Sequence, residues 1–120
     1  MKKLSVISLF FFFILGTSLV LAQAKIQSGK FSVNTSTANY TLDKNSGDRS
    51  VTIDVTYDKP FDKKPTVILS VTTLDTDTKT NVRYSIEPTS VSRDGFTIKI
   101  STWSESKIFG LGGTWLAVSE

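Results

Sequence analysis

The sequence predicts an all-β fold, a six-stranded antiparallel β-sandwich. In residues 51–57 and 96–102, apolar and polar side chains alternate, which is the period of a strand with one buried face. Roughly six such short segments follow one another at near-regular spacing, separated by turn-forming residues. No stretch after the N-terminal segment shows sustained helical periodicity, so a sandwich of antiparallel strands is favoured.

The first predicted strand covers residues 25–33. Gly29 within it indicates a bulge or a close approach by another group. Residues 34–50 are polar without an apolar period, and they predict a long connection of the kind that is often functional. Its turn signal, Ser46-Gly-Asp, places the carboxylate of Asp48 in the loop. Asp48 is a candidate ligand-binding acid, and ordinary turn chemistry is an equally good explanation.

The middle of the chain predicts two further strands, 51–57 and 66–74, joined by a proline-bounded connection. A polar hairpin loop follows at Asp75–Lys79. Its two aspartates suggest calcium only weakly, because a calcium site needs six or more oxygen ligands. A solvated turn is favoured, and no metal or other cofactor is expected.

The C-terminal part predicts strands at 81–87, 96–102 and 112–118. In the first of these, Val82 and Tyr84 share the apolar face, so Arg83 lies on the opposite, polar face. The connection between the first two strands begins at Pro88.

Residues 1–22 predict a secretory signal peptide, with residues 23–120 forming one mature domain. Lys2 and Lys3 precede a long apolar run, and small residues suited to cleavage follow it. An uncleaved membrane anchor is the alternative, since the run is near the lower length limit for a span. Cleavage predicts a secreted, extracellular protein that is not inserted in a membrane.

The composition excludes several classes of function. The chain has no Cys, hence no disulfide, thiol nucleophile or thiolate metal site. It has no His, which removes the usual general base and the commonest zinc ligand. Without Lys2 and Lys3, 12 basic residues stand against 11 acidic ones, a net charge of +1. The chain therefore has no basic patch, and a nucleic-acid partner is not expected.

Trp103 and Arg83 are the candidate binding residues that strand parity singles out. Trp103 falls on the face opposite Phe96, Ile98 and Ile100, where a large flat ring with one N–H donor is a binding platform. Arg83 offers five donors in a fixed fork. Each has a plainer explanation: Trp103 as a cover over the end of the core, which residue type alone favours, and Arg83 as a solvated surface residue.

The chain resembles the H-type lectin domain, the family of the snail agglutinins and the C-terminal domains of discoidins. The resemblance covers essentially the whole mature chain in order. It is carried by short matching stretches, which are Lys25–Phe31, Pro65–Val71, Leu74–Asp75, Asn81–Arg83, Gly95–Phe96, Thr102–Trp103, Lys107–Phe109 and Trp115–Ala117.

The resemblance implies a six-stranded sandwich that assembles as a homo-oligomer, a trimer or hexamer. It also implies a non-enzymatic protein that binds galactose or N-acetylgalactosamine at a site between neighbouring protomers. The implied site residues are Arg83, Trp103, Ser104, Phe109 and an acid of the first long loop, for which Asp48 is the nearest candidate. Phe109 stands where the family often has Tyr, and Ser104 is smaller than its counterpart in some members.

The resulting expectation is a secreted, multivalent lectin whose partners are glycans on glycoproteins or cell surfaces. The main alternative is a structural or cell-adhesion module that keeps the fold without binding sugar. A secreted glycosidase is a distant third, because no convincing pair of carboxylates is present.

Overall fold

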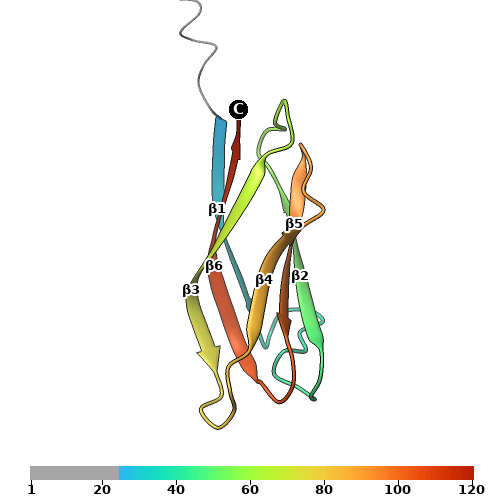
Figure 1. Ribbon diagram of the computed structural model, residues 1–120, viewed down its shortest axis with the longest axis vertical. Helices are drawn as coiled ribbons and strands as arrows, with labels where there is room; N and C mark the ends of the chain where they lie inside the picture. The colour runs from blue at the N-terminus through green and yellow to red at the C-terminus, as the bar shows by residue number, and fades with distance from the viewer. Residues whose placement is uncertain (1–24) are drawn as a thin grey trace, which may run out of the picture.

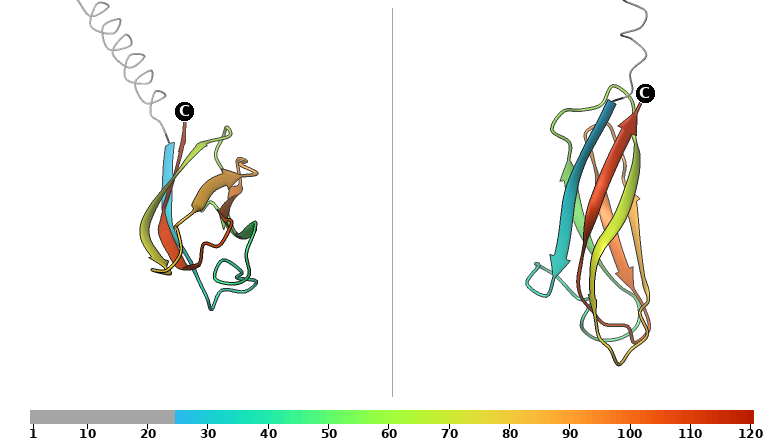
Figure 2. Two further views of the ribbon diagram at one scale, coloured as in Figure 1. Left: turned by 60° about the horizontal axis from the view of Figure 1, so that its bottom comes forward. Right: turned by 90° about the vertical axis from the view of Figure 1, so that its left-hand side faces the viewer.

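A computed structural model describes residues 25–120, so the predicted signal peptide lies outside the described residues. The six strands are β1 (Lys25–Asn34), β2 (Arg49–Thr56), β3 (Thr66–Thr76), β4 (Tyr84–Thr89), β5 (Gly95–Thr102) and β6 (Ile108–Ser119). They form two antiparallel three-stranded sheets, ordered β1-β6-β3 and β2-β5-β4. The sheets face each other as two layers (Figures 1 and 2), which confirms the six-stranded antiparallel β-sandwich.

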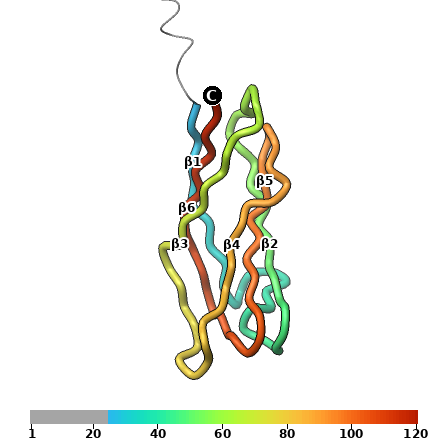
Figure 3. Tube along the Cα trace, viewed as in Figure 1, coloured from blue at the N-terminus to red at the C-terminus, as the bar shows by residue number. Residues whose placement is uncertain are grey.

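The chain changes sheet at almost every connection, as the tube in Figure 3 shows. Only β4 and β5 are both consecutive in sequence and paired in space. The last two strands, β5 and β6, each lie at the centre of a sheet. The turn between β5 and β6 therefore joins the middles of the two layers, and both edges of each sheet come from earlier parts of the chain.

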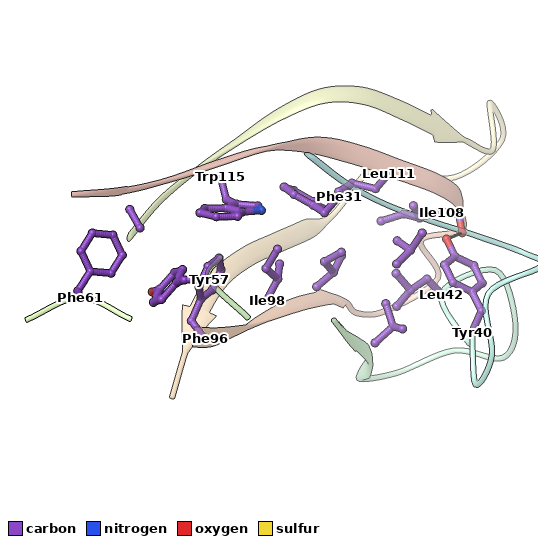
Figure 4. Packing of buried hydrophobic residues seen from close by; sticks show 14 residues of the cluster. Phe31, Tyr40, Leu42, Tyr57, Phe61, Phe96, Ile98, Ile108, Leu111 and Trp115 are labelled. Atoms are coloured by element: carbon purple, nitrogen blue, oxygen red, sulfur yellow. Dashed lines mark hydrogen bonds between the residues drawn. The ribbon is translucent and has the colours of Figure 1, made fainter. Parts of the chain in front are cut away.

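The core lies between the sheets and is rich in aromatic side chains at one end (Figure 4). Tyr57 contacts Phe61 edge-on with ring centroids 4.9 Å apart, and Phe96 meets Trp115 at 5.4 Å. The inward sets that strand parity predicts in β2 and β5 are buried or partly buried, and Ile98 and Ile100 are fully buried. Aromatic pairs in these geometries increase the free energy of unfolding beyond the contribution of apolar burial alone.

Gly29 is a point of close approach, one of the two explanations that its position suggests. It lies in β1 opposite Trp115 of β6, in an uninterrupted register. A Cβ atom at position 29 would lie 2.6 Å from Nε1 of the Trp115 indole. The absence of a side chain at Gly29 is therefore what lets this large ring pack into the core.

The predicted strand over residues 81–87 is wrong at both ends. β4 begins at Tyr84 and continues through Pro88, which is tolerated because β4 is an edge strand. Asn81, Val82 and Arg83 precede it, and Val82 is 48% exposed rather than on the buried face. Val82 lies two residues before β4, where the chain no longer keeps the alternation of the strand.

Other predicted boundaries also move, the start of β6 furthest, and one predicted connection is partly buried. β6 begins at Ile108, four residues before the predicted start, because pairing with strands on both sides offsets the low strand preference of its glycines. The connection between β1 and β2 is not wholly exposed: Tyr40 and Leu42 belong to the core and pack beside Ile108 (Figure 4). Isolated apolar residues in a loop have no period that reveals their burial.

Across residues 25–120, no helix combines the length and apolar character needed for a membrane span.

Candidate functional site

Three connections meet at one end of the sandwich, the lower end in Figure 1. They are residues 35–48, 77–83 and 103–107. Backbone hydrogen bonds tie them together: Gly47 N donates to Ser104 O at 2.9 Å, and Asp77 N donates to Lys107 O at 3.1 Å. The Lys107 ammonium also donates to the carbonyl of Asn45 at 3.2 Å. This end is therefore a connected surface formed by parts of the chain that are far apart in sequence.

The strand register aligns three of the sequence-predicted site residues in one row. Thr102, the last residue of β5, pairs with Arg49 of β2 on one side and with Tyr84 of β4 on the other. One step further out, Asp48, Trp103 and Arg83 follow at the ends of the same three strands. Thr102 Oγ1 donates to Arg83 O at 2.5 Å, and this hydrogen bond extends the β4–β5 register by one residue.

All three residues of this row are accessible from outside. Thr102 and Arg49 face inward and are buried, so their neighbours Trp103 and Asp48 face the opposite way. Trp103 is 40% exposed, Asp48 is exposed, and the side chain of Arg83 is 32% exposed. The prediction that Trp103 lies on the outer face is confirmed, and Trp103 does not cover the core.

Asp48 and Trp103 share one hollow of about 260 Å³ on the outer face of β2 and β5. Seven residues line the hollow, which are Asp48, Arg49, Ser50, Lys99, Ser101, Thr102 and Trp103. Arg83 is not part of its lining and lies beyond Trp103, next to β4. Along the backbone, Trp103 at the end of the central strand β5 thus lies between Asp48 at the end of β2 and Arg83 at the end of β4.

Arg83 forms an ion pair that strand parity did not predict. Its Nη1 lies 2.8 Å from Oε1 of Glu105, and Asn81 Nδ2 donates to the same oxygen at 3.3 Å. Ser104 Oγ donates to the other oxygen at 2.6 Å. The hydrogen bond from Ser104 and then the one from Arg83 lower the pKa of Glu105 to about 2, so this carboxylate is ionised at neutral pH.

Ser104, another of the predicted site residues, forms the bend that places these groups. Its φ is +58°, in the left-handed region that non-glycine residues rarely adopt. Two donors hold its carbonyl, Gly47 N and Arg49 Nη2, each at 2.9 Å. Backbone strain of this kind persists only where the surrounding structure enforces it.

Arg49, like Glu105, lies at this end of the sandwich and was not singled out from the sequence. It is only 9% exposed, and its guanidinium donates to the carbonyls of Gly47, Lys44, Asn45 and Ser104. Its acceptors are all backbone oxygens, which no residue-type motif can reveal. The only available signal was a basic residue on the inward parity of a strand, directly after Asp48.

The structure does not bring Phe109 into this row. Phe109 is 37% exposed at the start of β6, in the other sheet, and it does not line the hollow beside Trp103. The β3–β6 register shifts where Asp75 pairs with Gly110 and Thr76 pairs with Ile108, so Phe109 is an extra residue in β6.

Asp75 belongs to the end of β3 and Asp77 to the connection after it, so the predicted hairpin loop at Asp75–Lys79 begins two residues later. Asp77 Oδ1 accepts a hydrogen bond from Lys79 N at 2.9 Å, which is ordinary turn chemistry. In residues 25–120, no three His, Cys, Asp or Glu side chains gather as metal ligands would.

Comparison with known proteins agrees with this architecture. Residues 52–118 match the family described as the H-type lectin domain. A Fuscovulum blasticum protein described as ATP synthase subunits region ORF 7 is 35% identical over 72 residues, which cover 60% of this chain and 63% of that protein. A discoidin-1 chain of Dictyostelium discoideum is 29% identical over 82 residues, covering 68% of this chain and 32% of the discoidin.

A solved structure, recombinant discoidin II of Dictyostelium discoideum, superposes with a TM-score of 0.72 at 20% identity. The superposition covers 82% of this chain and 38% of the discoidin II chain. The chain thus spans less than two thirds of the length of each of these relatives. The family match covers more than half of the chain, from β2 to the end of β6, and the chain belongs to the H-type lectin domain family.

Proposed function

We propose that the mature protein is a secreted, non-enzymatic lectin that binds galactose or N-acetylgalactosamine-type glycans through several copies of one site. The observation that carries this proposal is the row of Asp48, Trp103 and Arg83 at one end of the sandwich. Membership of the H-type lectin domain family supports carbohydrate as the class of ligand.

The chemistry of the row suits a neutral sugar. A galactose-type ring has an axial and an equatorial hydroxyl close together, beside an apolar patch of C–H bonds. A carboxylate such as Asp48 accepts from hydroxyls, the Arg83 fork donates to them, and the Trp103 indole covers the C–H patch. Such a site requires neither a metal ion nor a titrating group.

The position of Phe109 supports a site that two protomers complete. The family resemblance implies an aromatic contact from Phe109, yet this residue is exposed on β6 of the other sheet. A neighbouring copy can supply its Phe109 to the Trp103 and Arg83 of the first. Because Phe109 lacks the hydroxyl of Tyr, its contact with the sugar would be purely apolar.

The outer face of the β1-β6-β3 sheet supports self-association. Ile26 is 62% exposed and Ile68 is 55% exposed, and they flank Leu116 and Val118 of β6 in the register. A small domain without disulfides gains stability by covering such a surface with another copy. A trimer or hexamer would also provide the several sites that useful avidity requires.

A glycan array with the purified mature chain tests the proposal. We expect retention on terminal galactose or N-acetylgalactosamine and loss of that signal in Trp103→Ala. A folded oligomer that binds no glycan on the array contradicts the lectin function and favours the structural or adhesion module of the same fold.

A further inference from the structure

Glu105 is a fixed acidic group beside the proposed sugar-binding row. It lies two residues after Trp103 and accepts hydrogen bonds from Asn81, Arg83 and Ser104. Its side chain is nevertheless 48% exposed. The carboxylate is therefore held in one place by three donors and still faces the solvent.

The pair of Arg83 and Glu105 retains hydrogen-bonding capacity on both partners. An ionised carboxylate has about four lone-pair sites, and the three donors named above leave room for one more. Arg83 has five N–H donors, and Glu105 is the one side chain in residues 25–120 that its guanidinium is seen to bond. A donor and an acceptor are thus presented to solvent side by side.

We propose that Glu105 is a specificity-determining residue that contacts the sugar directly, accepting a hydrogen bond from one ring hydroxyl while Arg83 donates to the next. The proposal rests on the proposed carbohydrate-binding function. Neighbouring hydroxyls of a pyranose ring lie about as close together as two hydrogen-bonded atoms. They match the 2.8 Å separation of Arg83 Nη1 and Glu105 Oε1.

The proposed role of Glu105 differs from that of Asp48. Asp48 lies in the hollow on the β2 side of Trp103, whereas Glu105 bonds to Arg83 on the β4 side. The two acids therefore lie toward opposite neighbours of β5, β2 for Asp48 and β4 for Glu105, and the proposal places the sugar against Trp103 between them. Because the Arg83–Glu105 ion pair has no net charge overall, this part of the site favours a neutral diol over an anionic sugar.

The test compares Glu105→Gln with wild type by calorimetry, using methyl galactoside and its deoxy analogues as probes. Glutamine keeps the size and one acceptor but loses the charge. We expect at least a tenfold loss of affinity for methyl galactoside, the range of a hydrogen bond to a charged group. The deoxy analogue that lacks the contacted hydroxyl should bind both proteins equally.

Glu87→Gln is the matched control, since Glu87 is exposed on β4 and outside the hollow. It should bind methyl galactoside as wild type does. An affinity of Glu105→Gln within twofold of wild type overturns the inference. So does an equal loss for every deoxy analogue, because that result means Glu105 acts only by orienting Arg83.

Failure of the proposed function gives a different result. If the folded wild-type protein binds none of the probes, both the proposed function and the inference fall. If wild type binds and Trp103→Ala does not, the site is correct, and the behaviour of Glu105→Gln alone decides the inference.

Discussion

Arg49 Nη2 lies 2.9 Å from the carbonyl oxygen of Ser104, which joins the first residue of β2 to the turn after β5. The same guanidinium donates to Gly47 and Lys44 in the connection between β1 and β2. Arg49 thus links two segments that are 55 positions apart, and it holds Ser104 in its unusual backbone conformation. This buried cation makes Arg49 the main positioning residue of the site.

Replacing Arg49 should therefore loosen the site and destabilise the fold. We expect Arg49→Ala to lower the free energy of unfolding by about 2 kcal/mol or more, because several buried carbonyls lose a charged donor. Urea unfolding measures this change. Arg93→Ala is the control, since Arg93 is exposed and its Nε donates to one carbonyl, that of Phe61. Equal free energies of unfolding for the two variants would show that the Arg49 hydrogen bonds stabilise the fold no more than the single one of Arg93.

The two tryptophans should respond oppositely to substitution. Trp103→Ala should abolish galactose-type binding and leave the fold intact, because Trp103 is 40% exposed. Trp115→Ala should cost about 3–5 kcal/mol, because Trp115 packs among Tyr57 and Phe96 in the core. Circular dichroism and calorimetry on both variants check this pair. Unfolding of Trp103→Ala would mean that the indole supports the core after all.

Arg83→Ala should behave like Trp103→Ala, losing binding without unfolding. Arg83 precedes β4, its side chain is partly exposed, and its ion pair lies at the surface, where such pairs contribute little to stability. Calorimetry with methyl galactoside measures the loss. Normal binding by both folded variants would place the site elsewhere on the molecule.

The sequence revealed the strand faces well and the site only in part. Residues 51–57 and 96–102 alternate along regular strands, so parity identified the buried Ile98, and it extended to the outward Trp103, one residue after β5. Parity failed at Val82, which precedes its strand, and at Leu42, which is buried from a loop. Contacts outside regular pairing depend on where distant segments meet, and a local period carries no information on that.

The two missed site residues show the same limit. Glu105 bonds to Arg83 across 22 positions, and Arg49 bonds to carbonyls that every residue type possesses. Neither contact leaves a motif in the sequence. The register that aligns Asp48, Trp103 and Arg83 was likewise unknown until the pairing of β5 with β2 and β4 was seen.

Glu105 should remain ionised in mild acid. The pKa of Glu105 is lowered from 4.5 to about 2, first by the hydrogen bond from Ser104 and then by the one from Arg83. A carboxylate with a lowered pKa contributes stability that is present above its ordinary pKa and lost as the pH falls toward 2. A carboxyl titration by NMR should give a midpoint near 2 for Glu105 and a higher one in Ser104→Ala. A midpoint near 4.5 in wild type would contradict this hydrogen-bond network.

The remaining prediction concerns assembly, on which multivalent binding depends. A shallow site for one monosaccharide buries little surface, so each contact should be weak, and avidity requires several sites on one particle. One short domain without an internal repeat provides these only through closed symmetry. We expect light scattering with in-line size exclusion, at micromolar concentration and neutral pH, to show a trimer or hexamer that agglutinates cells bearing terminal galactose-type sugars.

A charged substitution on the exposed apolar face of the β1-β6-β3 sheet should disrupt this assembly. Ile68→Lys puts a charge among Ile26, Leu116 and Val118, so it should dissociate the oligomer and abolish agglutination. Thr56→Lys is the control, because Thr56 is exposed at the end of β2 in the other sheet, away from both that face and the proposed site. It should leave the mass unchanged. A wild-type protein that stays monomeric would overturn both the site completed by a neighbour and agglutination, whereas an oligomer that survives Ile68→Lys would move the interface to another surface.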